Sequence, residues 1–315
     1  MKFIHFISLI LITGLIVSCN NSEKKENPEK SWKANHVVLI GLDGWTAGSI
    51  AQADMPNVKN LMKNGSYTLK KRSALPSSSA INWASMFMGA GPELHGYTQW
   101  GSQTPELDSR VISHYGMFPS IWGLFRDQYA KAKTGYFYQW EGLKYLAEME
   151  AMSRQEHTII NENEEENKIN AAEQTTLNGC RYIEEEKPNL IGILIDEPDH
   201  TGHTSGFDSP EYIDMVSQLD KYVGMIVESV KKAGIYDETI FIVTSDHGGI
   251  NKNHGGKTMN EMETAFIVSG KGIKKGYEFT ESMMQYDVAS TIAYIFNIEQ
   301  PQVWIGRPMT QIFEK

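Results

Sequence analysis

The sequence predicts an α/β fold in which helices cover both faces of a mostly parallel central sheet. Four apolar runs of strand length recur along the 315 residues, and amphipathic stretches of helix length separate them. Runs that are apolar without alternation are typical of strands buried on both faces, as in a parallel sheet. Strands that alternate with helices indicate an open sheet sandwiched between two helical layers.

The individual elements can be placed by their composition. The apolar runs predict strands over residues 36–42, 190–195, 239–244 and 265–268. The amphipathic stretches predict helices over residues 56–63, 169–185, 210–233 and 286–296. We expect them all to belong to a single domain over 35–315.

Composition and charge exclude several classes of protein. The 41% hydrophobic and 22% charged content is ordinary for a globular chain, so the whole chain is not disordered. The formal net charge of −10 disfavours bulk nucleic acid as a partner, because phosphate backbones bind basic surfaces. With only Cys19 and Cys180, the chain offers neither a disulfide framework nor a thiolate zinc site.

The first 34 residues have the composition of an export signal and a tether. Lys2 precedes an apolar run over 3–17, which is shorter than the ~20 residues that a bilayer span needs. Residues 16–19, Ile-Val-Ser-Cys, resemble a bacterial lipobox. We therefore expect a lipoprotein signal peptide over 1–18, a lipidated Cys19 as membrane anchor, and a flexible tether over 19–34. The alternative is an ordinary secretory signal with an incidental Cys.

An acidic segment interrupts the pattern. Residues 145–186 hold eleven Glu against three basic residues. We interpret this stretch as the solvated face of a helical insertion around 141–186, rather than as a cation-binding patch.

Polar side chains follow three of the four predicted strands. Asp43 comes directly after the first strand, Asp199 lies four residues after the second, and Asp246 follows the third. The carboxyl ends of parallel strands meet in one crevice, where open α/β sheets bind their ligands. We expect the three carboxylates to lie close together.

Imidazoles accompany these carboxylates. His203 is one helical turn beyond Asp199, His247 is adjacent to Asp246, and His254 stands in Asn-His-Gly-Gly. Carboxylates and imidazoles are ligands that zinc accepts without thiolates. Gly248 and the glycine after it allow the sharp turn that would let Asp246 and His247 reach one metal.

At this point the chain resembles the alkaline phosphatase superfamily, and within it the type I phosphodiesterase/nucleotide pyrophosphatase branch. The matching segments run in family order from residue 37 to about residue 307. They are VVLIGLDG, PSSSAIN, GPELHG, EPDHTGH, TSDHGG, NHGG, MMQYDVASTIAYIF and GRPM. The resemblance implies an alkaline-phosphatase-like three-layer sandwich and a hydrolase of small-molecule phosphate esters.

The resemblance implies two zinc ions. One site would use Asp43, Asp246, His247 and the nucleophile oxygen. The other would use Asp199, His203 and His254.

The branch has its nucleophile three residues before an Asn, which selects Ser79 ahead of Asn82; Ser77 and Ser78 are rivals on composition alone. The implied reaction is an in-line double displacement through phospho-Ser79. Metal coordination would activate the serine hydroxyl without a general base. The Asn82 amide would donate to a phosphoryl oxygen, unless it is a helix-cap or turn Asn.

Two departures from the branch concern the substrate. Ala80 stands where an aromatic residue commonly follows the nucleophile, and Trp83 where a His often follows the Asn. Both weaken the interpretation as a nucleotide pyrophosphatase. The aromatic run 136–140 is either the wall of a leaving-group pocket or a strand with core contacts. A phosphate monoesterase needs a basic clamp, for which the candidates are Arg72, Arg126, Lys131 and Lys133.

Several alternatives stay open. The same metal centre could serve a phosphate monoesterase or a phosphoethanolamine or phosphonate hydrolase, and a catalytically dead scaffold in the bacterial cell envelope is the non-enzyme reading. A sulfatase is disfavoured because no C/S-x-P-x-R string occurs and Gly44 follows Asp43 where sulfatases carry a second Asp. A cofactor-independent phosphoglycerate mutase is also disfavoured, because such a protein would be longer and cytosolic, which conflicts with the predicted signal peptide. The sequence does not predict the oligomeric state.

Overall fold

The structure is a computed structural model that describes residues 32–159 and 166–315, and of residues 166–170 only the backbone. The predicted signal peptide and the lipidated Cys19 lie outside the described residues. Trp32 and Ala34, at the end of the predicted tether, are buried. The Trp32 ring packs against Phe125 and Phe296, with ring centroids 5.8 and 5.1 Å away, so the packed domain includes these residues.

A single sheet of eight strands forms the centre of the described chain, in the order β4-β3-β5-β1-β6-β7-β2-β8. The strands are β1 (His36–Asp43), β2 (Gly65–Arg72), β3 (Thr134–Tyr138), β4 (Arg154–His157), β5 (Leu190–Pro198), β6 (Thr239–Thr244), β7 (Glu263–Gly270) and β8 (Tyr277–Glu278). Only β7 pairs antiparallel with its neighbours, so the sheet is mostly parallel as predicted.

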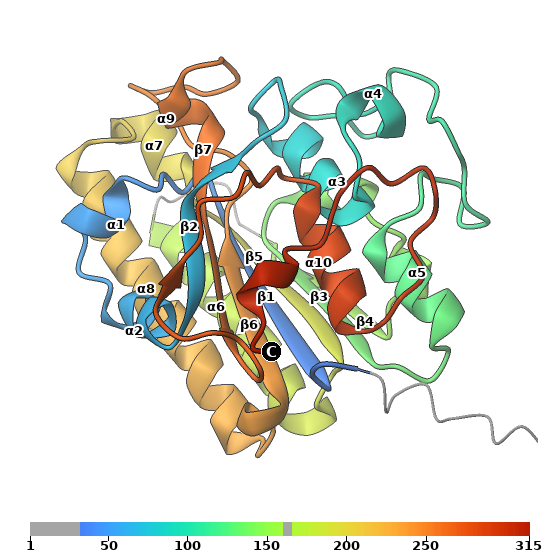
Figure 1. Cartoon of the computed structure of the whole chain (residues 1–315). Coiled ribbons are helices and arrows are strands. Elements are labelled where there is room, and N and C mark those ends of the chain that lie inside the picture. The colour runs from blue at the N-terminus through green and yellow to red at the C-terminus, as the bar shows by residue number, and fades with distance from the viewer. Residues whose placement is uncertain (1–31, 160–165) are drawn as a thin grey trace, which may run out of the picture.

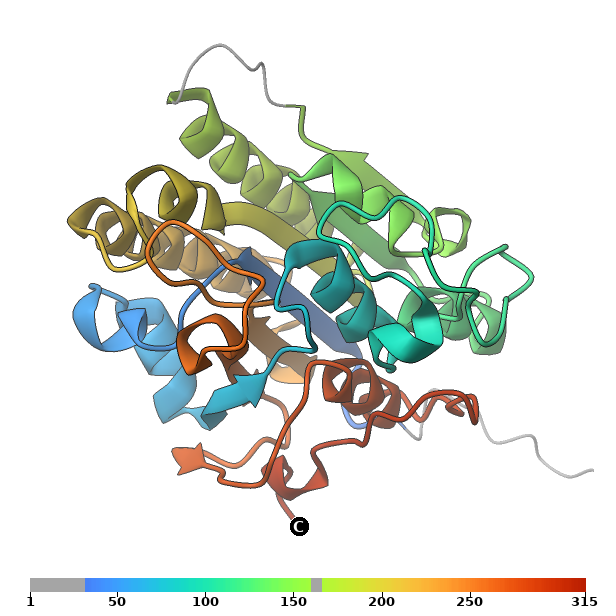
Figure 2. The ribbon, with the colours of Figure 1, turned by 90° about the horizontal axis from the view of Figure 1, so that it is seen from above.

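Helices cover both faces of this sheet (Figures 1 and 2). They are α1 (Ser49–Gln52), α2 (Pro56–Lys63), α3 (Ser79–Met88), α4 (Pro92–His95), α5 (Ile121–Gln128), α6 (Glu166–Glu186), α7 (Asp199–Ser205), α8 (Pro210–Lys232), α9 (Met259–Met262) and α10 (Asp287–Ile295). One layer contains α2, α6 and α8, and the other contains α3, α5 and α10. The three-layer prediction is confirmed.

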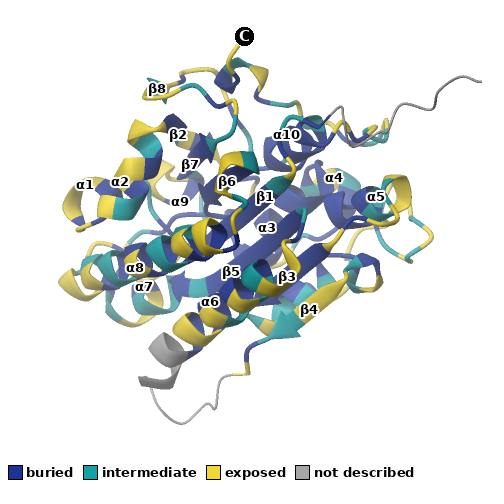
Figure 3. Cartoon of the chain, turned by 90° about the horizontal axis from the view of Figure 1, so that it is seen from below, coloured by how far each residue is buried: buried dark blue, intermediate teal, exposed yellow. Residues whose placement is uncertain are grey.

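The alternation of side chains along β1 explains the two layers. Val37 and Leu39 face the core under α3 and α10, whereas Val38, Ile40 and Leu42 face the core under α2 and α8. Because successive strand side chains point to opposite faces, a strand buried on both sides must be apolar throughout. Figure 3 shows the central strands β1 and β5 and the helix α3 buried, while α6 and α8 expose their outer faces.

All four predicted strands and all four predicted helices are present, and their ends differ from the prediction by at most three residues. The sequence did not predict β2, β4 and β8, and it offered a strand as one of two interpretations of the region of β3. The run 136–140 is mostly strand β3, with Tyr136 and Phe137 buried, although Trp140 beyond it lines a cavity described below.

The acidic segment is part of the layered fold. In α6, Ala172, Thr176 and Ile183 are buried, whereas the glutamates 184–186 near its end are exposed or half-buried. The helix therefore covers the sheet with its small and apolar side, and β3 and β4 beside it are strands of the same sheet.

The strands β5, β1 and β6 are neighbours and run parallel, so their carboxyl ends meet at one edge. In Figure 1, α7 and α9 lie at this end of the sheet, at the top of the view. Within the described chain, no helix combines the length and apolar character that crossing a membrane requires.

Candidate metal centre and nucleophile

Two buried carboxylates and a partly buried one meet at the carboxyl edge of the sheet. Asp43 ends β1, Asp199 begins α7 directly after β5, and Asp246 lies two residues beyond β6. The backbone N–H of Gly44 donates to Asp246 Oδ1 at 3.1 Å, which ties two of these loops together. Each carboxylate keeps one buried oxygen without a hydrogen-bond partner, namely Asp43 Oδ1, Asp199 Oδ1 and Asp246 Oδ2. Buried oxygens without a donor are costly unless a cation occupies the space between them.

The three candidate imidazoles point the same nitrogen at this space. The Nδ1 atoms of His203, His247 and His254 lie 2.9, 2.8 and 3.2 Å from backbone carbonyls, of Lys252, Gly248 and Ser77 respectively. A carbonyl only accepts, so Nδ1 carries the proton in the neutral ring and Nε2 keeps a free lone pair. This tautomer is the one in which an imidazole binds a metal through Nε2.

The ligand atoms form two overlapping groups. Asp43, Asp246 and His247 form one, with His247 Nε2 at 3.5 Å from Asp43 Oδ1 and 3.2 Å from Asp246 Oδ2. Asp199, His254 and again His247 form the other. His254 Nε2 is 3.7 Å from Asp199 Oδ1, and His203 Nε2 is 3.3 Å from Asp199 Oδ2. All six predicted Asp and His ligands therefore lie close together.

Burial and mutual repulsion make this cluster unfavourable without a cation. Burial and the nearby Asp246 raise the pKa of Asp43 well above its usual range. Burial and Asp199 raise the pKa of Asp246 to about 8. Burial lowers the pKa of His247 to about 3 and that of His254 to about 4, so both rings are neutral at physiological pH. Neutral imidazoles and crowded carboxylates with oxygens lacking donors fit divalent cations such as zinc.

Ser79 lies against this cluster, as the first residue of α3. Its Oγ is 3.1 Å from His247 Nε2. Of its two rivals, Ser77 donates its Oγ hydrogen to the carbonyl of Gly256 at 2.6 Å, and Ser78 is the N-cap residue of α3. The helix N-terminus at Ser79 also favours negative charge at this point.

We expected the Asn82 amide to donate to a phosphoryl oxygen, but in the structure it contacts the backbone of the preceding turn. Its side chain is completely buried, and its Oδ1 accepts from the backbone N–H of Ala74 at 2.7 Å. Its Nδ2 lies 3.1 to 3.2 Å from the carbonyls of Ala74, Pro76 and Ser78. The amide thus holds the turn before α3, which corresponds to the turn-Asn alternative.

Glycines permit the close approach of the loops. Gly44 has φ +64°, and a Cβ there would lie 2.5 Å from Asp199 Oδ1. We expected Gly248 and Gly249 to allow a sharp turn after Asp246, and neither of them has a positive φ. A Cβ on Gly248 would instead lie 2.2 Å from the carbonyl oxygen of Asn260, so glycine provides space there.

Sequence reasoning missed two residues that support the site. Trp83 Nε1 donates to Asp43 Oδ2 at 2.9 Å. Lys71 is completely buried in β2 and donates to the carbonyl of Ser245, just before Asp246. Burial lowers the pKa of Lys71 to about 7. The departure from the family at position 83 signalled the first, whereas a Lys in a polar segment gives no sign of burial.

Ser79 opens into a cavity of about 730 Å³. Its walls include the strand end at Asp196, the loop carrying Trp100, and Trp140. The candidate basic clamp is not part of them: Arg72 pairs with Glu263 and Lys133 with Glu186.

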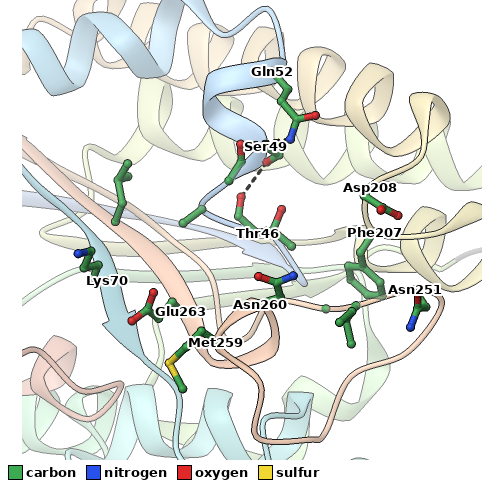
Figure 4. Close-up of a pocket in the computed structure, with 15 residues that line it drawn as sticks. Thr46, Ser49, Gln52, Lys70, Phe207, Asp208, Asn251, Met259, Asn260 and Glu263 are labelled. Carbon is green, nitrogen blue, oxygen red and sulfur yellow. Dashed lines mark hydrogen bonds between the residues drawn. The ribbon is translucent and has the colours of Figure 1, made fainter.

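A second cavity, of about 440 Å³, lies beside the first turn of α1 (Figure 4). Thr46, Lys70, Phe207, Asn251 and Glu263 are among the residues around it, and no candidate metal ligand lines it. Its lining combines the basic Lys70 with acidic and amide side chains, which points to no particular ligand, and we assign it no role.

Comparison with known families supports the resemblance to type I phosphodiesterases that the sequence motifs indicate. The family model of type I phosphodiesterase / nucleotide pyrophosphatase matches residues 37–288. The chain is 27% identical over 230 residues to ectonucleotide pyrophosphatase/phosphodiesterase family member 7 of Mus musculus, covering 69% of this chain and 50% of that protein. It is 25% identical over 241 residues to venom phosphodiesterase 2 of Crotalus adamanteus, covering 73% and 28%. The chain thus spans half or less of the length of these relatives.

Solved structures share the fold at low sequence identity. Murine ectonucleotide pyrophosphatase / phosphodiesterase 5, inactive and in complex with AMP, superposes with a TM-score of 0.71 at 17% identity, covering 89% of this chain and all of that one. A 2-O GAG sulfatase superposes with a TM-score of 0.73 at 13% identity, covering 89% and 74%. These likenesses show the fold alone, the alkaline-phosphatase-like sandwich.

Proposed function

Because the chain belongs to the type I phosphodiesterase/nucleotide pyrophosphatase family, we propose that it hydrolyses phosphodiesters at Ser79. The observation that carries the proposal is the convergence of the Ser79 hydroxyl with three unpartnered carboxylate oxygens and three Nε2 atoms. Nucleotide pyrophosphates, which the family name includes, are the second substrate class to test.

The residues that would hold two zinc ions follow from the two groups. Asp43, Asp246, His247 and Ser79 would form one site, and Asp199, His203 and His254 the other. When bound, the ions supply Lewis-acid stabilisation of the phosphoryl oxygens and lower the pKa of the serine hydroxyl.

The chain itself positions the nucleophile. The Asn82 amide fixes the turn before α3, and this places Ser79 Oγ at the edge of the cavity that receives the ester. Attack of Oγ on phosphorus forms the Oγ–P bond of a phospho-Ser79 ester, which keeps one organic group of the substrate, and breaks the bond to the other, which leaves as an alcohol with the hydroxyl proton. Water then breaks the Oγ–P bond, which releases a phosphate monoester and returns free Ser79. The N-terminus of α3 stabilises the negative charge that gathers there.

His247 is unsuited to act as the base of a serine–histidine pair, although it lies 3.1 Å from Ser79 Oγ. In a serine triad a carboxylate accepts the Nδ1 proton and stabilises the charged ring. Here Nδ1 meets the Gly248 carbonyl, and burial lowers the ring's pKa to about 3. The geometry therefore supports a ligand role for His247.

The test is hydrolysis of bis-p-nitrophenyl phosphate and p-nitrophenyl phosphate, after chelation and again with zinc added back. We expect zinc-dependent release of nitrophenol, faster from the diester. Faster cleavage of the monoester would favour the monoesterase alternative. Cleavage of neither ester, with less than one bound zinc per chain by elemental analysis, would favour the dead scaffold.

We further propose that the protein is an exported lipoprotein of the bacterial cell envelope. The support is the sequence alone, namely the short apolar run over 3–17 followed by Cys19. Metabolic labelling with a radioactive fatty acid tests this proposal. We expect label and membrane association in the full chain, and loss of both in Cys19→Ser; an unlabelled, soluble full chain would contradict the proposal.

A further inference from the structure

Lys71 is a completely buried basic residue whose hydrogen-bond partners lie next to the candidate metal centre. It belongs to β2, and its Nζ donates to the carbonyl of Ser245 at 2.6 Å and to Oε1 of Gln285. Gln285 is also completely buried and lies two residues before α10. A long basic side chain is rarely buried without such partners. The pair therefore forms a polar contact inside the domain that joins β2 to the segment before α10.

The surroundings of the Gln285 amide fix its orientation. Its Nε2 lies 3.3 Å from the backbone carbonyl of Asn82 and 3.3 Å from that of Ser245. Carbonyls only accept, so the amide nitrogen must face them and the amide oxygen must face Lys71. If the Lys71 donor were removed, this oxygen would be buried without its partner, and the amide would lose the contact that holds it in this orientation.

The Gln285 amide connects two parts of the candidate site. The carbonyl of Asn82 lies in the first turn of α3, three residues after Ser79. The carbonyl of Ser245 directly precedes Asp246, in the loop after β6 that also carries the next candidate ligand. One side chain thus contacts both the helical turn of the nucleophile and the loop of the metal ligands.

The backbone of Gln285 is held independently of its side chain. Its N–H donates to the carbonyl of Arg72 at 2.8 Å, and the N–H of Arg72 donates to the carbonyl of Met283 at 2.9 Å. The Oγ of Ser73, the next residue, donates to the carbonyl of Asp246 at 2.7 Å. Because these contacts use backbone groups and Ser73, we expect a change of the Lys71 or Gln285 side chain to break the amide link without displacing the end of β2.

We propose that Lys71 and Gln285 are positioning residues that hold the nucleophile Ser79 in place against the metal-binding loop after β6. The inference rests on the proposed function, because it takes Ser79 as the nucleophile. Misplacement of a reacting atom by about 1 Å can cost about 100-fold in rate. Lys71 acts through Gln285, since it orients the amide that makes both contacts.

Hydrolysis of bis-p-nitrophenyl phosphate by Lys71→Met and Gln285→Met tests the proposal, because methionine is close in length to both native side chains. We expect kcat to fall about 10- to 100-fold and KM to change less than about twofold. The double variant should lose about as much kcat as the more affected single variant, because the two residues act as one unit. Losses that multiply in the double variant overturn the proposal.

Asp220→Ala is the control for a general loss of stability. The Asp220 carboxylate is buried and accepts from the backbone N–H groups of Asn57 and Val58, in the helical layer on the other face of the sheet from α3. This variant should unfold at a lower temperature and keep the wild-type kcat. If both methionine variants also keep it, the proposal is wrong. If Lys71→Met does not fold, the comparison of Gln285→Met with Asp220→Ala decides.

A measurement without substrate separates this inference from the proposed function. The visible absorption spectrum of the cobalt-loaded protein reports the geometry of the metal ligands, and Ser79 is itself a candidate ligand. We expect both methionine variants to change this spectrum and to bind cobalt about tenfold more weakly, whereas Asp220→Ala should match the wild type. Wild-type spectra and affinities in both methionine variants overturn the proposal. If the wild type cleaves no diester, the proposed function fails while the spectra still decide whether Lys71 and Gln285 position the ligands.

Discussion

The indole N–H of Trp83 donates to Asp43 Oδ2 at 2.9 Å and leaves Asp43 Oδ1 directed at His247 Nε2, 3.5 Å away. The Trp83 ring packs against Gly41 of β1, where a Cβ would lie 2.5 Å from the ring. One side chain of α3 thus orients a candidate metal ligand at the end of β1. Loss of a hydrogen bond of this kind to a metal ligand typically lowers metal affinity 10- to 100-fold.

Replacing Trp83 by Phe should therefore lower zinc affinity by about 10- to 100-fold, because Asp43 loses the donor that orients it. Isothermal titration of the metal-free protein measures the effect. Trp122→Phe is a matched control, since Trp122 is also buried in the core beneath α3 and α10 but its Nε1 has no partner. Equal zinc affinities in the two variants would contradict the orienting role.

Gly44→Ala should weaken zinc binding at least about tenfold. The substitution displaces the candidate ligand Asp199, and we expect this to cost at least as much affinity as the loss of a group that orients a ligand. The added methyl would meet Asp199 Oδ1 at 2.5 Å, and the φ of +64° strains any non-glycine residue. Gly48→Ala provides the comparison, because a Cβ at Gly48 has no atom within 4 Å. If Gly44→Ala binds zinc like Gly48→Ala, the close approach of the two loops is not required.

Zinc affinity should rise with pH between about 6 and 8. Metal binding requires the carboxylates ionised, and the metal-free site holds a proton on Asp246, whose pKa is about 8, and on Asp43, whose pKa is also raised. His247 and His254, with pKa values of about 3 and 4, release none in this range, whereas His203, whose pKa is raised by its hydrogen bond to Asp199, adds to the release. Titrations in buffers of different ionisation enthalpy should show release of about one proton or more per chain near pH 7. Asp246→Asn should reduce that number, and release of none would contradict the assignment.

Asn82→Ala should lower the free energy of unfolding by about 2–4 kcal/mol, because it leaves the buried N–H of Ala74 and nearby carbonyls without partners. Urea unfolding measures this loss. Asn64→Ala, at the exposed end of α2, should cost much less. An unchanged stability with a rate reduced about 100-fold would instead support a direct role of Asn82 toward the phosphoryl group.

The fold could be predicted where burial leaves a simple signature. β1, β5 and β6 each contain an unbroken apolar run because both of their faces are covered, and this pattern predicts a buried strand. β2 (Gly65–Arg72) carries three basic residues at its end and gives no such pattern. One of these, Lys71, is nevertheless buried because tertiary contacts supply it with carbonyl acceptors.

The candidate metal ligands could be predicted where they lie at or just beyond the end of a predicted strand. Asp43, Asp199 and Asp246 could be placed together because parallel strand ends meet at one edge. The environment of Asn82 could not, since it depends on how the backbone of residues 74–78 folds around the side chain. Trp100 and Asp196 likewise line the cavity at Ser79 only because a loop and the end of β5 converge there.

The central claim is that Ser79 is the nucleophile of a metal-dependent phosphodiesterase. The most direct test compares zinc-supplemented hydrolysis of bis-p-nitrophenyl phosphate by the wild type, Ser79→Ala and Ser78→Ala, with zinc content measured in each. The account predicts a loss of at least about 1000-fold in kcat for Ser79→Ala, as expected when a nucleophile is removed, and a change of less than about tenfold for Ser78→Ala, whose hydroxyl makes no helix-capping hydrogen bond. Hydrolysis by Ser79→Ala at the wild-type rate would contradict it.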